Sequence, residues 1–291
     1  MSEASPQTPA PVDPNATKIY LWPNLMTAGN LLCGFMAILR ILQGTIERSN
    51  GGDFPSTGWV EIYLSSLWFI LGACLFDLLD GRVARVTKSE SPFGREFDSI
   101  ADVVSFGVAP ALLVYEIVLK EFDLGWFIAA VYLVCGALRL ARFNVHAALP
   151  QKEKGPGSEF TGFPIPAGAG LVSSITLLIL HLYGTDVALD QGWGKYGLVV
   201  LLLCVSWMMF SGFKYPSFKT FNFRTAHSPI KFLVGIAVLA LAIKYYWWML
   251  ALIFVSYLLY GFCRPFVSRA TRRQIEDDDD EEDEEDASAS I

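Results

Sequence analysis

The sequence predicts an all-α fold, a polytopic membrane bundle of about eight transmembrane helices. Of its 291 residues 53% are hydrophobic, and the mean hydropathy is +0.41, both high for a soluble domain. A spanning helix needs about 20 largely apolar residues, and several segments reach that length. The five cysteines lie in apolar runs without zinc-ligand or CxxC spacing, and the three histidines are scattered.

The first four predicted spans cover residues 19–42, 59–80, 98–119 and 124–145. The first follows a polar, proline-rich stretch. The second ends on a pair of aspartates, and the third begins on another pair. The fourth carries two arginines near its end, so charged side chains mark the same side of the bundle on three of these four helices.

The other four predicted spans cover residues 165–183, 195–212, 229–245 and 247–264. Two prolines should distort the start of the first of these, and a tight turn in the sequence KYYWW joins the last two. Aromatic side chains collect at the predicted ends, which is typical of the membrane interface; they include Trp22, Trp126, Trp193, Tyr196, Trp247 and Trp248.

The two ends of the chain differ from its body. Residues 1–17 contain four prolines among polar residues and no apolar segment, so we expect a disordered arm rather than a signal peptide. Residues 266–291 include the unbroken acidic run 276–286, and we expect a solvated, disordered tail. The tail could bind a basic partner or raise solubility, and both remain open. The transmembrane domain is predicted at residues 18–265.

The distribution of Lys and Arg predicts the orientation. If the N-terminus is cytoplasmic, most of the 22 basic residues face the cytoplasm, and the outer side keeps only Arg40, Arg48, Lys120, Lys195 and Lys244. This is a strong positive-inside bias. We therefore expect a multi-pass protein of the cell inner membrane with both termini, and the aspartates described next, on the cytoplasmic side.

Four aspartates flank the connection between the second and third spans: Asp77, Asp80, Asp98 and Asp102. Their spacings of three and four place each pair on one face of a helix. The connection is short, so the two helices should be antiparallel neighbours. The four carboxylates should therefore converge at one edge of the membrane.

Uncompensated carboxylates beside hydrocarbon are costly, and hard divalent cations with phosphate ligands would neutralise them. Gly81 and Gly94 leave room for a phosphate, and Arg85 offers a bidentate donor. Two other interpretations remain open. The aspartates could be helix-end charges paired with Arg82, Arg85 and Arg95, or they could form the ion site of a cation transporter.

The complete pattern is Asp77-x-x-Asp80-Gly81-x-x-Ala84-Arg85, eight residues, then Gly94-x-x-x-Asp98-x-x-x-Asp102. It resembles the signature of the CDP-alcohol phosphatidyltransferase family, without departure. The resemblance implies a six-helix catalytic core and two Mg²⁺ or Mn²⁺ ions held by the four aspartates, with Asp102 also acting as the base. It places the CDP group against Gly81, Ala84 and Arg85, and we add Gly94 to that set.

Four further stretches narrow the resemblance: PNLMTAGNLLCG, GALRLARFNV, FTGFPIPAGAG and KYPSFK. Together they resemble the membrane-integral members that use serine as the acceptor alcohol, which implies CDP-diacylglycerol and L-serine as substrates. In the family the first stretch, here with Asn24, Thr27 and Asn30 on one face, helps to hold the nucleotide. Glycerol 3-phosphate and an inositol phosphate remain open as acceptors.

Serine would bring a carboxylate to a site whose aspartates already bind metal, so a cation must meet it. Arg142 is our first candidate, because it lies one turn beyond Arg139 near the cytoplasmic edge and beside Asn144. Lys214 is the second candidate, and Arg139 is expected to bind phosphate. We also expect a homodimer in the lipid bilayer and no nucleic-acid partner.

Overall fold

The computed structural model describes residues 21–49, 58–87, 91–148, 162–183, 193–211 and 244–263. In these residues the regular structure is helical and no strand occurs, so the predicted all-α class is confirmed. The chain divides into two compact units, Met1–Glu116 and Ile117–Ile291.

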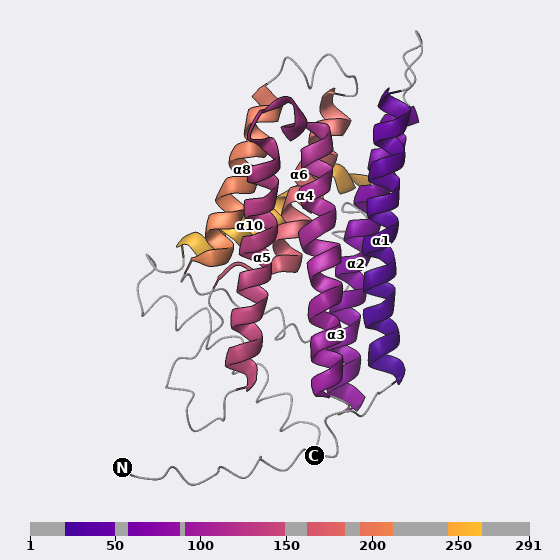
Figure 1. Cartoon of the computed structure of the whole chain (residues 1–291), viewed down its shortest axis with the longest axis vertical. Helices are drawn as coiled ribbons and strands as arrows, with labels where there is room; N and C mark the ends of the chain where they lie inside the picture. The colour runs from indigo at the N-terminus through magenta and orange to yellow at the C-terminus, as the bar shows by residue number, and fades with distance from the viewer. Residues whose placement is uncertain are drawn as a thin grey trace, which may run out of the picture. The chain divides into compact units, whose positions relative to one another are not determined.

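The described residues of the first unit form three long helical segments (Figure 1). They are α1 (Leu21–Ser49), α2 (Gly58–Thr87) and a continuous third span, Pro92–Ile117. The third span contains α3 (Pro92–Asp102), the π-helical segment η1 (Val103–Val108) and α4 (Ala109–Ile117). The helix α1 packs against α2, α3 and η1, so it contacts both of the helices that carry the aspartates.

One face of α1 is buried and built largely from small or polar residues. Its members alternate at spacings of four and three along the whole helix: Pro23, Thr27, Asn30, Gly34, Ala37, Ile41 and Gly44. Small residues let membrane helices approach closely. At Gly34 the approach is so close that a Cβ would lie 2.7 Å from the Cα of Ser105. This buried face of α1 therefore sets the distance between α1 and the third span.

The described residues of the second unit form a short 3₁₀ turn, η2 (Leu119–Glu121), and four long helices. These are α5 (Gly125–Ala148), α6 (Ile165–Tyr183), α8 (Trp193–Phe210) and α10 (Tyr246–Cys263). The helix α8 packs against α5 and α6, and α6 also packs against α10.

The two prolines near α6 lie at the start of the helix, where proline is tolerated. Pro164 immediately precedes the helix and Pro166 lies in its first turn. Backbone N–H groups in the first turn have no partner within the helix, so a proline there costs no hydrogen bond. Just before them Gly162 has a φ of 90°, which favours glycine, and the N–H of Phe163 donates to the carbonyl of Met208 at 3.1 Å. The prolines thus end an irregular approach segment rather than bend the helix.

Among the residues that the structure describes, five helices are long and apolar enough to cross a membrane: Leu21–Ser49, Gly58–Val83, Pro92–Ile117, Gly125–His146 and Ile165–Leu182. Two shorter apolar helices, Tyr196–Phe210 and Tyr246–Tyr260, match two further predicted spans. These helices identify an integral membrane protein. Nearly all of the predicted span 229–245 lies outside the described residues, as do the arm 1–17 and the tail 266–291, so the total of eight stays a prediction.

Several helices are longer than predicted. The helix α1 continues to Ser49 and not only to residue 42, and the third span begins at Pro92 rather than at residue 98. The third span starts early because Ser91 caps it: its Oγ accepts a hydrogen bond from the N–H of Gly94 at 3.0 Å, and Pro92 occupies the first turn. Hydropathy marks the apolar part of a helix, whereas capping determines where the helix begins.

Candidate metal centre

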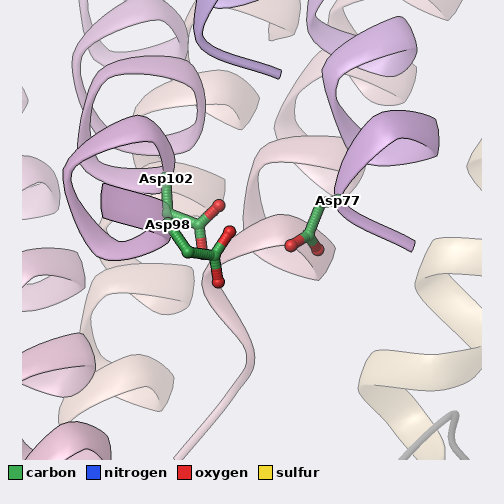
Figure 2. Close-up of side chains that lie close together, drawn as sticks. All are labelled: Asp77, Asp98 and Asp102. Carbon is green, nitrogen blue, oxygen red and sulfur yellow. The ribbon is translucent and has the colours of Figure 1, made fainter. Parts of the chain in front are cut away.

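Three aspartates come together where α2 and α3 face each other. Asp77 of α2 and Asp98 and Asp102 of α3 each offer one carboxylate oxygen, and these three oxygens all lie within 4.8 Å of one another. Figure 2 shows the side chains of Asp98 and Asp102 directed from one helix toward Asp77 on the other. The spacing of four residues within α3 puts its two carboxylates on the same face, as the sequence predicts.

Asp80 lies one turn beyond Asp77 on α2, and its carboxylate faces α1. It accepts a hydrogen bond from the hydroxyl of Thr27, and it is only 8% exposed. Asp80 is not one of the three residues with oxygens within 4.8 Å, but its negative charge acts on Asp98, as does that of Asp77. The structure therefore places Asp80 beside the cluster and attaches it to α1.

Asp102 is 5% exposed and is also attached to α1. The side-chain amide of Asn30 donates from Nδ2 to Oδ1 of Asp102 at 3.0 Å. One turn further, the hydroxyl of Ser105 donates to the backbone carbonyl of Asn30 at 3.0 Å. The helix α1 thus hydrogen-bonds to one carboxylate of α2 and to one carboxylate of α3.

The three clustered carboxylates fit a divalent metal ion. Their like charges repel one another at this separation, so the cluster needs a cation. In the part of the chain that the structure describes, Oδ1 of Asp98 is buried and has no hydrogen-bond partner, as expected of an oxygen that ligates a metal. Carboxylate oxygens suit Mg²⁺, Ca²⁺ and Mn²⁺. Asp77, Asp98 and Asp102 could therefore hold a hard divalent cation.

The alternative of helix-end charges reaching for water fits this geometry poorly. Such side chains extend into solvent, yet Asp80 and Asp102 are both buried. The side chains of Arg82 and Arg95 are exposed. The side chain of Arg85 lies outside the described part of the structure.

The remaining nucleotide candidates are distributed over α1, α2 and α3. The buried Nδ2 of Asn24 has no hydrogen-bond partner among the described residues. The Oδ1 of the same side chain would lie 3.4 Å from a Cβ at Gly94, so Asn24 reaches the first turn of α3. A Cβ at Gly81 would meet no described atom within 4 Å. The backbone of Ala84 lies in α2, and its side chain lies outside the described part of the structure.

The two candidate arginines lie near the end of α5 in the second unit, and both are half-buried. Arg142 donates from Nη2 to the carbonyl of Ser211, just after α8, at 3.3 Å. Arg139 lies over the ring of Phe143, with 5.6 Å between its Cζ and the ring centroid. Lys214 is outside the described residues.

Sequence reasoning gave no individual role to two residues that contact the aspartates or their neighbours. The sequence pattern marks Asn30 only as part of a polar face, and no pattern marks Ser105. The regular spacing of Asn24, Thr27 and Asn30 is a signal that α1 contacts a polar site. Nothing comparable in the sequence predicts the π-helical segment η1, which starts immediately after Asp102.

These observations define the class of the protein: an integral membrane helix bundle with a partly buried carboxylate cluster suited to a hard divalent cation. The sequence profile of the CDP-alcohol phosphatidyltransferase family matches residues 20–211, which is well over half of the chain and includes every residue of the cluster. The chain belongs to this family.

Several curated relatives are similar over most of their length. A Helicobacter pylori (strain J99) protein is 37% identical over 72% of this chain and 76% of its own. A Methanocaldococcus jannaschii protein is 39% identical over 69% of this chain and 86% of its own. A Bacillus subtilis protein is 33% identical over 68% of this chain and 90% of its own length. Each of the three is named CDP-diacylglycerol–serine O-phosphatidyltransferase.

Proposed function

We propose that this protein transfers the phosphatidyl group of CDP-diacylglycerol to L-serine, forming phosphatidylserine and CMP. The observation that carries the proposal is the similarity to relatives named for this reaction, which covers most of both chains. The clustering of three signature aspartates at one point supports it. A cation transporter is a weaker interpretation, because three of the four carboxylates cluster at one point between α2 and α3 rather than along a path through the bilayer.

The aspartates have two roles in this proposal. Asp77, Asp80, Asp98 and Asp102 would hold two Mg²⁺ or Mn²⁺ ions. When bound, such ions polarise the pyrophosphate and stabilise the negative charge that develops on the departing CMP. Asp102 accepts the proton of the serine hydroxyl. The serine oxygen forms a bond to the β-phosphorus, which carries the lipid, and the bond from that phosphorus to the oxygen of CMP breaks.

The nucleotide would lie against the ends of α1, α2 and α3. Asn24 supports this placement, because its buried Nδ2 can donate to a base or phosphate and has no described partner. Gly81 supports it because the space beside its Cα is open. We assign Thr27, Ala84, Arg85 and Gly94 to the same CDP site from the family signature and the polar face of α1.

Purified protein incubated with CDP-diacylglycerol and a panel of alcohols tests the proposed reaction. We expect CMP release and a phosphatidylserine product, identified by mass spectrometry, with serine as the acceptor. Glycerol 3-phosphate and an inositol phosphate should give little product. Preferential transfer to either of these would keep the chemistry and reject serine, whereas absence of transfer to any alcohol would reject the proposal.

Arg142 is our candidate for binding the serine carboxylate, with Lys214 as the second candidate and Arg139 assigned to phosphate. A guanidinium can bind a carboxylate through two parallel hydrogen bonds, which an ammonium group cannot reproduce. We expect Arg142→Lys to raise the KM for serine at least about tenfold, or about 1.4 kcal/mol, with little change in the KM for CDP-diacylglycerol.

The contact between Arg142 and the carbonyl of Ser211 makes a stability measurement necessary in the same experiment. Ser211→Gly keeps the carbonyl and removes only the side chain, so it serves as a control for damage at the end of α8. If Arg142→Lys raises the KM for CDP-diacylglycerol and leaves that for serine unchanged, Arg142 binds phosphate, and the serine assignment passes to Lys214.

We further propose that the enzyme works as a homodimer in the cell inner membrane, with both termini and the aspartates in the cytoplasm. Single cysteines added to the arm and to the tail should resist an impermeant thiol reagent applied to intact cells. Asp123→Cys, between the third span and α5, should react from outside. Labelling of the arm or the tail, after subtraction of the native cysteines, would contradict this topology.

A further inference from the structure

Asn30 occupies the centre of the contact between α1 and the third span. It is fully buried, at 0% exposed. Its Nδ2 donates to Oδ1 of Asp102, and its backbone carbonyl accepts from Ser105, both at 3.0 Å. Asn30 therefore joins α1 to the third span through its side chain and its main chain together.

The direction of the side-chain bond is set by chemistry. An ionised carboxylate can only accept hydrogen bonds, so the amide of Asn30 must turn its NH₂ group toward Asp102. A carboxylate held at one oxygen cannot rotate freely. The bond from Asn30 thus determines how the carboxylate of Asp102 is presented to Asp77 and Asp98.

Stability alone does not account for an asparagine at this position. With Nδ2 on Asp102, the other end of the amide, Oδ1 of Asn30, is buried and has no hydrogen-bond partner among the described residues. A buried acceptor without a donor destabilises the folded state, and an apolar side chain of similar size would avoid that cost. An asparagine at this position is explained if orienting the carboxylate of Asp102 contributes more to function than the unpaired Oδ1 costs in stability.

A second hydrogen-bonding residue of α1 provides a contrast. Thr45, far along the same helix, lies 3.1 Å from the hydroxyl of Tyr63 and donates to the carboxylate of Glu116 at 3.0 Å. It also joins α1 to α2 and to the third span, but it is remote from the aspartate cluster. Thr45→Val therefore removes a comparable link between helices without touching the site.

We propose that Asn30 is a positioning residue, which orients the carboxylate of Asp102 for metal binding and for accepting the proton of the acceptor alcohol. The inference rests on the proposed function, because it assumes that Asp102 performs both roles. Asn30 acts on the reaction through its hydrogen bond to Asp102, so we call it a positioning residue and not a catalytic one.

The first test compares Asn30→Leu, Asn30→Asp and Thr45→Val in the full-length protein. Asn30→Leu removes the donor, and Asn30→Asp keeps the shape but replaces the donor with an acceptor. We expect both to lower kcat at least about tenfold at saturating Mn²⁺, the effect typical of residues that orient metal ligands. The KM values for CDP-diacylglycerol and serine should stay within about threefold, and Thr45→Val should keep the wild-type kcat.

The second test measures metal binding without any substrate. Mn²⁺ is titrated into each purified variant, and free Mn²⁺ is followed by electron paramagnetic resonance. Asn30→Leu should weaken Mn²⁺ binding by about tenfold, because Asp102 is no longer held toward the other two carboxylates. Thr45→Val should bind Mn²⁺ as the wild type does.

The results separate the positioning role from its alternatives. Wild-type kcat and Mn²⁺ affinity in Asn30→Leu would overturn the proposal, and so would losses no greater than those of Thr45→Val, since both indicate a packing role. If the wild type transfers to an alcohol other than serine, the proposed acceptor is wrong, but the Mn²⁺ titration still decides the role of Asn30. A wild-type protein that binds no Mn²⁺ would overturn both proposals.

Discussion

Asp98→Asn is expected to lower the rate of phosphatidyl transfer about 100-fold or more, while the protein still folds and inserts into the membrane. The substitution changes the shape of the side chain very little, but it removes one negative charge and one of the three clustered carboxylates. Since Oδ1 of Asp98 makes no hydrogen bond in the described structure, the variant breaks no contact there. The loss should be measured as a lower rate of CMP release at saturating Mn²⁺.

Asp123→Asn is the matched control. Asp123 is exposed, between η2 and α5, so the same chemical change should leave the transfer rate at the wild-type level. Both variants should elute as the wild type does in size-exclusion chromatography. Near wild-type turnover of Asp98→Asn at saturating Mn²⁺ would contradict the assignment of this cluster to the metal.

Gly34→Ala is expected to destabilise the protein. Outside the nucleotide site, we expect no other glycine-to-alanine substitution in α1 or α2 to cost as much. The new Cβ would lie 2.7 Å from the backbone Cα of Ser105, and backbone atoms cannot move aside as a flexible side chain can. Overpacking of this kind costs about 1–3 kcal/mol. Because Asn30 contacts Asp102 one turn away, separating the helices should also lower kcat, and Gly34→Leu should do so more strongly.

Gly72→Ala adds the same methyl group to α2, where its nearest described neighbour would be the Sγ of Cys33 at an ordinary 3.8 Å. It should retain the wild-type unfolding temperature and activity. Thermal unfolding in detergent and CMP release together check both variants. Equal unfolding temperatures for Gly34→Ala and Gly72→Ala would show that α1 does not pack against Ser105 as described.

The clustering of Asp77, Asp98 and Asp102 could be predicted from the sequence because it depends on local geometry. Residues three or four apart share a helix face, and a short connection makes neighbouring helices antiparallel. The hydrogen bond from Thr27 to Asp80 could not be predicted in the same way. It depends on how far α2 is rotated toward α1, and that rotation is set by contacts between residues far apart in the chain, such as Gly29 against the ring of Phe76.

The helix boundaries show a similar division. Hydropathy located the apolar middle of each described span, whereas the start of α3 depends on the cap formed by Ser91 and Pro92. A serine followed by proline, with glycine three residues after the serine, is readable as a capping signal, so this boundary could have been found. The segment η1 has no such signal, because a π-helical turn results from packing against neighbouring helices.

The segment η1 (Val103–Val108) lies between the half of the third span that carries Asp98 and Asp102 and the half formed by α4. A π-helical turn is equivalent to one residue inserted into an α-helix, and one residue corresponds to about 100° of rotation. The two halves of this span are therefore out of phase with a continuous α-helix. Deleting one residue of η1 would restore that phase, and either the aspartates or the buried face of α4 would then point in the wrong direction. Insertions and deletions should consequently be tolerated far less in this short segment than conservative substitutions, although none of its residues carries a charge.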